Sequence, residues 1–118
     1  MPKLVLIADD YDDAARLMAE VIEMGSEFVA VAALDGVEAI AKAEERRPDI
    51  AVLDIDMPHI GGIEAARLLR AMFPSKPPLL IACTGRLEID EVRRSGMFDH
   101  VLSKPVGLDV LLPLFARA

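Results

Sequence analysis

Five short apolar runs alternate along the chain with segments whose apolar residues recur at helical spacing. The runs cover residues 4–8, 28–33, 50–53, 79–83 and 101–102. Continuous apolar runs of this length are typical of strands that are buried on both faces. Regular alternation of such strands with helices indicates a parallel sheet that carries helices on both of its faces. This pattern limits the possible folds more than any other feature of the sequence.

A helical pattern follows each of the five runs. Apolar residues three and four positions apart predict helices around residues 14–22, 65–73, 87–95 and 108–115. The second helix is expected to begin at a capping box formed by Asp35 and Glu38, and to end before Pro48. Pro113 lies inside the last helical pattern, where a proline should kink the helix or fray its final turns.

The length and the charge of the chain limit its class. A chain of 118 residues fits one domain, residues 1–118, and an apolar fraction of 53% supplies a core. Acidic residues outnumber basic ones by 20 to 13, which gives a net charge of -7. This balance disfavours a nucleic-acid surface, which normally needs a basic patch, but it suits the binding of cations.

The single cysteine and the N-terminal apolar run narrow the class further. One cysteine, Cys83, excludes an internal disulfide and a multi-cysteine zinc site, and its apolar surroundings predict a buried, inert thiol. The run at residues 4–8 is too short for a signal peptide or a membrane span. We therefore expect a cytoplasmic protein that associates with neither membranes nor nucleic acid.

Polar side chains stand at the ends of four predicted strands. Asp9 and Asp10 follow the first run, Asp54 the third, Thr84 the fourth, and Lys104 comes after the fifth. Each has an ordinary interpretation when taken alone, since an aspartate can cap a helix, a threonine can close a turn and a lysine can be solvated. In a parallel sheet, however, the carboxyl ends of the strands meet at one edge, where ligands bind.

The combination of these residue types favours phosphoryl chemistry. Three carboxylates in one crevice repel each other unless a cation joins them, and oxygen ligands suit Mg²⁺. A lysine and a hydroxyl opposite the carboxylates would neutralise and hydrogen-bond phosphoryl oxygens. An aspartate can then act as a nucleophile and carry the phosphoryl group as an acyl phosphate. Asp54 is the best candidate because it ends the central strand.

The motifs at these strand ends resemble those of the receiver domains of two-component response regulators. They are Asp9-Asp10, Asp54-Ile55-Asp56-Met57-Pro58 with Gly62, Thr84-Gly85 and Lys104-Pro105, and their order and spacing cover nearly the whole chain. The resemblance implies a flavodoxin-like (βα)5 fold, a doubly wound parallel sheet of five strands in the order 2-1-3-4-5.

The resemblance also implies a metal site and a phosphoacceptor. Asp54 would be the phosphoacceptor, and Asp9, Asp10 and Asp54 would hold Mg²⁺, with Asp10 a more direct ligand than Asp9. Asp56 would contribute its backbone carbonyl to the same ion.

Further implied roles concern the phosphoryl group and its source. Thr84 would contact this group and shift on activation, and Lys104 would pair with one of its oxygens. The bond between Lys104 and Pro105 is expected to be cis. The phosphoryl group would come from a histidine kinase or a histidine phosphotransfer protein, and the signal would pass to a downstream target protein by docking. Beyond self-phosphorylation and slow self-dephosphorylation, no enzymatic activity is implied.

Two positions depart from the usual receiver pattern. Receivers usually carry an aromatic residue three positions before the lysine, where this chain has Val101, so we expect a weak or altered switch. An acidic residue often precedes Gly62 in relatives, where Gly61 here should make the loop more pliable. His59 lies in the same loop, and we expect it to be an exposed residue without a catalytic role.

Two other functions remain open from the sequence. A haloacid-dehalogenase-like phosphatase would use Asp54 as its nucleophile and Asp56 as a general acid, although the pair Asp9-Asp10 would then come unusually early and there is no room for a cap domain. A degenerate receiver would act only as a protein-binding module, and the complete set of site residues argues against it. Turnover would separate the three hypotheses.

Overall fold

A single parallel sheet organises the molecule in a computed structural model that describes residues 2–118. Its strands are β1 (Leu4–Ala8), β2 (Val29–Ala33), β3 (Ile50–Asp54), β4 (Leu79–Thr84) and β5 (His100–Ser103). The strands lie side by side in the order β2-β1-β3-β4-β5, and every neighbouring pair is parallel. The strand order expected from the resemblance, 2-1-3-4-5, is therefore confirmed.

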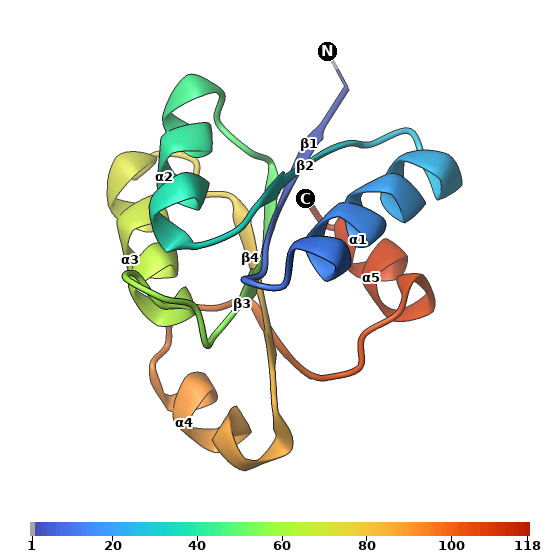
Figure 1. Cartoon of the computed structure of the whole chain (residues 1–118). Helices are drawn as coiled ribbons and strands as arrows, with labels where there is room; N and C mark the ends of the chain where they lie inside the picture. The colour runs from blue at the N-terminus through green and yellow to red at the C-terminus, as the bar shows by residue number, and fades with distance from the viewer. Residues whose placement is uncertain (1) are drawn as a thin grey trace.

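Helices connect the strands and cover both faces of the sheet (Figure 1). They are α1 (Asp12–Gly25), α2 (Gly36–Glu45), α3 (Gly62–Met72), α4 (Ile89–Arg94) and α5 (Leu108–Phe115), and a 3-10 turn, η1 (Arg86–Glu88), precedes α4. In Figure 1, α1 and α5 lie on one side of the sheet, and α2 and α3 lie on the other. None of the helices in residues 2–118 is long and apolar enough to cross a membrane.

Alternate residues of each strand pack on opposite faces of the sheet. Leu6 and Leu53 pack in a cluster with buried residues of α2 and α3, whereas Ile7 and Val52 pack in a second cluster with Leu111 and other residues of α1 and α5. Because successive side chains of a strand point to opposite faces, a strand that is covered on both sides must be apolar throughout. This requirement explains the continuous runs in the sequence.

The start of α2 shows how the sequence positions a helix. Asp35 accepts a hydrogen bond from the backbone amide of Glu38 (2.7 Å), as the predicted capping box requires. The carboxylate of Glu38 accepts a hydrogen bond from the amide of Leu34 (3.2 Å), one residue earlier than the capping box predicts. The helix ends at Glu45, ahead of Pro48.

The region before β5 differs from the predicted single helix. The expected helix at residues 87–95 is divided into the 3-10 turn η1 and the short helix α4. Gly96 ends this region with a φ of 71°, the left-handed conformation that glycine adopts without strain. Pro113 lies within α5, which ends two residues later at Phe115.

Candidate functional site

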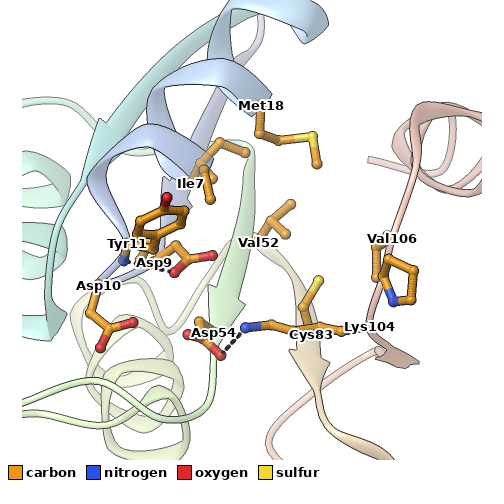
Figure 2. Close-up of a pocket in the computed structure, with 13 residues that line it drawn as sticks. Ile7, Asp9, Asp10, Tyr11, Met18, Val52, Asp54, Cys83, Lys104 and Val106 are labelled. Carbon is orange, nitrogen blue, oxygen red and sulfur yellow. Dashed lines mark hydrogen bonds and ion pairs between the residues drawn. The ribbon is translucent and has the colours of Figure 1, made fainter.

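A pocket of about 550 Å³ opens at the carboxyl ends of β1 and β3 (Figure 2). Its polar lining includes Asp9, Asp10, Asp54 and Lys104. The rest of its wall is largely apolar, and it includes Ile7, Met18, Val52, Cys83 and Val106. Asp54 is the last residue of β3, and Asp9 and Asp10 directly follow β1, so the sheet itself brings these residues together.

The three aspartates form a cluster of carboxylates. One oxygen from each of Asp9, Asp10 and Asp54 lies within 4.8 Å of the other two. Asp54 is only 6% exposed, whereas Asp10 is exposed. Asp9 accepts a hydrogen bond from the backbone amide of Tyr11 (3.0 Å), which fixes its carboxylate at the turn into α1. The sequence prediction that these residues converge is therefore confirmed.

Lys104 is the cation that faces this cluster. Its ammonium group lies 2.9 Å from a carboxylate oxygen of Asp54, although 43% of its side chain is exposed (Figure 2). Its backbone amide donates a hydrogen bond to the carbonyl of Thr84 (2.8 Å), which attaches the end of β5 to β4. The bond between Lys104 and Pro105 is cis, as expected from the resemblance.

The pKa values of Asp54 and Lys104 are both raised, for different physical reasons. Burial raises the pKa of the Asp54 carboxyl group, and Asp9 and Asp10 raise it further, although Lys104 partly opposes the shift. Burial alone would lower the pKa of Lys104, but its hydrogen bond with Asp54 and the charges of Asp54 and Asp9 raise it overall. Both groups therefore hold protons more tightly than usual, Asp54 chiefly because it is buried and Lys104 because it lies beside carboxylates.

This donor set fits Mg²⁺. The cluster offers carboxylate oxygens and neither thiolate nor imidazole, and oxygen ligands are those that Mg²⁺ prefers. A divalent cation would also offset the repulsion by Asp9 and Asp10, which adds to the effect of burial on the pKa of Asp54. Asp56 lies in the exposed turn after β3, and its use of a backbone carbonyl as a ligand stays a prediction.

Thr84 ends β4 at the same edge of the sheet, and its contact with a phosphoryl group stays a prediction. It is 1% exposed, and its hydroxyl donates a hydrogen bond to a carboxylate oxygen of Glu88 (3.1 Å). The described residues that line the pocket do not include Thr84. The sequence analysis missed Glu88, and the signal that could have found it is an acid four residues after the hydroxyl, within reach through one helical turn.

The loop after Asp54 depends on a glycine. A Cβ atom at Gly62 would lie 2.4 Å from the carbonyl oxygen of Asp54, which is too close for any other residue type. The amide of Gly62 donates to the carbonyl of Ile55 (2.9 Å), so the loop folds back tightly onto the end of β3. His59 is exposed in this loop, as expected, and adopts a φ of 68°, which is uncommon for a residue other than glycine.

Cys83 lies next to Asp54 across the β3–β4 pairing and lines the pocket. It is 9% exposed, and burial raises the pKa of its thiol to about 12. The thiol is therefore protonated near neutral pH, and the prediction that the cysteine is buried is confirmed.

Comparisons with known proteins agree with this site. Residues 5–115 match the family described as the response regulator receiver domain. The polar-differentiation response regulator DivK of Brucella anthropi is 32% identical over 110 residues, which cover 92% of this chain and 89% of that protein. A protein-glutamate methylesterase/protein-glutamine glutaminase of Thermotoga maritima is 33% identical over 106 residues, which cover 87% of this chain but only 30% of that protein.

A solved structure extends the similarity to the fold. The receiver domain (CheY-like) from Methylobacillus flagellatus has a TM-score of 0.85 and 28% identity, and the match covers 99% of this chain and 98% of that one. The flavodoxin-like sheet that the two chains share is therefore that of the CheY-like receiver domains, which are signalling domains. This chain belongs to the receiver domains of two-component response regulators. Receivers are signalling domains and generally not enzymes, and the phosphatase alternative finds no support in these matches.

Proposed function

We propose that Asp54 is the phosphoacceptor of this receiver, with residues 1–118 acting as one domain. The observation that carries the proposal is the environment of Asp54, a buried carboxylate that faces Lys104 at 2.9 Å and lies within 4.8 Å of Asp9 and Asp10. A nucleophilic carboxylate next to a fixed ammonium group is suited to phosphoryl transfer, in which catalysis depends mainly on positioning and charge.

The transfer itself is a simple exchange of bonds. A carboxylate oxygen of Asp54 attacks the phosphorus of a phosphohistidine, the phosphorus–nitrogen bond breaks, and the released imidazole nitrogen takes up a proton. Lys104 can turn from Asp54 toward a phosphoryl oxygen, because nearly half of its side chain is exposed and free to move. Asp9, Asp10, Asp54 and the backbone carbonyl of Asp56 would hold Mg²⁺, which supplies positive charge to the phosphoryl oxygens.

The partners follow from the same chemistry. The donor would be a histidine kinase or a histidine phosphotransfer protein in the cytoplasm. The phosphorylated domain would then dock on a downstream target protein. Val101, half-buried on β5 beside Ala82, replaces the usual aromatic residue, so the conformational signal would be weak or would follow another route.

Intact mass spectrometry tests this proposal directly. After incubation with acetyl phosphate and Mg²⁺, the wild-type chain should gain one phosphoryl group, and Asp54→Asn or removal of the metal should abolish the gain. Asp56→Asn serves as the matched control, because it keeps the backbone carbonyl and should still be phosphorylated. A phosphatase would instead lose activity in this variant.

A protein donor completes the test, since some receivers accept phosphoryl groups only from their partners. The same measurement is therefore repeated with phosphorylated histidine phosphotransfer proteins. Phosphorylation of Asp54→Asn, or no modification of the folded wild type by either donor, would overturn the proposal. The second result would favour a protein-binding module.

A further inference from the structure

The hydroxyl group of Thr84 is already occupied in this structure. It donates to Glu88 at 3.1 Å, in a site where Thr84 is almost fully buried and Glu88 is half-buried. A threonine hydroxyl has one proton and therefore donates one hydrogen bond at a time. The same proton cannot be given to Glu88 and to a phosphoryl oxygen on Asp54.

The position of Glu88 is set by its own backbone. Glu88 ends the 3-10 turn η1, and its amide donates to the carbonyl of Gly85 (3.2 Å). This short turn brings the carboxylate back over Thr84, directly before α4 begins at Ile89. Hydrogen bonds to a charged acceptor are stronger than those between neutral groups, so Glu88 is an effective competitor for the proton.

We infer that Glu88 is a positioning residue that holds the Thr84 hydroxyl away from the phosphorylation site until a phosphoryl group on Asp54 competes for it. The inference rests on the proposed function. When the hydroxyl turns to the phosphoryl oxygen, Glu88 loses its partner and the start of α4 is released. The movement of Thr84 is thereby coupled to η1 and α4 without an aromatic residue at position 101.

Affinity for beryllium fluoride, a stable analogue of a phosphoryl group on a carboxylate, tests the inference. The variants are Glu88→Gln and Glu88→Ala, with Mg²⁺ present and the fluorescence of Tyr11, the single tyrosine at the pocket mouth, as the readout. We expect affinity to rise about three- to tenfold, where tenfold corresponds to about 1.4 kcal/mol. The matched control is Glu91→Gln, which removes the same charge from exposed α4 and should change affinity less than about twofold.

A double-mutant cycle separates this role from a merely structural one. In a Thr84→Val background, where no hydroxyl remains to be released, Glu88→Gln should give no further gain in affinity. A gain that persists in this background, or no gain from either Glu88 substitution, would overturn the inference. If the wild-type chain itself bound no beryllium fluoride at Asp54, the proposed function would have failed instead, so the two failures are distinguishable.

Discussion

Aspartates stand at both edges of the sheet, and their hydrogen-bond partners differ between the two edges. At the amino edge, Asp49 accepts a bond from the amide of Leu4 (2.8 Å) and returns one from its own amide to the carbonyl of Leu4 (2.9 Å). Asp99 repeats this arrangement with Leu80, with both distances 2.8 Å. Each carboxylate thus takes up a backbone amide that would otherwise lack a partner in the sheet.

The two edges of the sheet also differ in how the charges of their aspartates are balanced. Asp49 pairs with Arg47 at 3.2 Å, and Asp99 lies 3.7 Å from Arg70, so each of these two acids has its own cation. At the carboxyl edge, three carboxylates share the ammonium of Lys104. An acid that is paired with its own cation therefore stabilises the fold, whereas a surplus of like charge at a strand end indicates a site that a ligand completes.

Substitutions at the two edges should differ most in their effect on the affinity for Mg²⁺. Asp10→Asn should lower the affinity for Mg²⁺ by about a hundredfold or more, since substitutions in the outer shell of a metal site alone cost about 10- to 100-fold. Titration of Tyr11 fluorescence with MgCl₂ measures the affinity next to the cluster. Asp49→Asn is the matched control at the other edge and should leave the affinity for Mg²⁺ unchanged. Equal losses in both variants would remove the distinction between the edges.

The second predicted effect is on the stability of the fold. Here a substitution at the amino edge should cost more than one at the carboxyl edge. Asp49→Ala should lower the free energy of unfolding by about 2 kcal/mol, because it leaves the amide of Leu4 without an acceptor and Arg47 without its partner. Urea denaturation in EDTA measures the change. Asp49→Asn keeps an acceptor oxygen, so its free energy of unfolding should fall less than that of Asp49→Ala. Asp10→Asn should lose little stability, because the side chain of Asp10 is exposed. A larger loss in Asp10→Asn would contradict the comparison.

The carboxyl edge could be predicted from the sequence because of its simple geometry. Apolar runs locate the strands, parallel strands end at one edge, and the polar residue after each run must then lie there. The apolar pattern therefore predicts that Asp9, Asp10, Asp54 and Lys104 lie together, although the strand order is implied only by the family resemblance.

Local competition for hydrogen bonds could not be predicted in the same way. The pattern places Thr84 at the right edge, but its choice of Glu88 depends on the rotamer of one buried side chain and on the turn η1. The amino-edge role of Asp49 was also missed, although an acid directly before an apolar run is a visible signal. Such contacts depend on the exact position and rotamer of single residues, which the periodicity of apolar residues does not resolve.

The smallest predicted effect concerns the pH dependence of stability at Asp54. Because the pKa of Asp54 is raised in the folded protein, the folded state binds this proton more tightly than the unfolded state does. Ionised Asp54 therefore lowers stability at neutral pH, and the cost disappears as the pH falls below the ordinary carboxyl value of 3.8. In EDTA, Asp54→Asn should be more stable than wild type at pH 7, and this gain should shrink as the pH approaches 4.

In Asp54→Asn the ammonium group of Lys104 loses its charged partner. This loss does not cancel the gain in stability, because Lys104 stays partly solvated. Thermal unfolding in EDTA at several pH values measures the difference, with the exposed neighbour Asp56→Asn as a control that should change little. Excess Mg²⁺ should reverse the order, since a metal that binds the folded state stabilises the wild type by mass action. A gain for Asp54→Asn that is independent of pH would show that packing, and not surplus charge, sets the difference between the two edges.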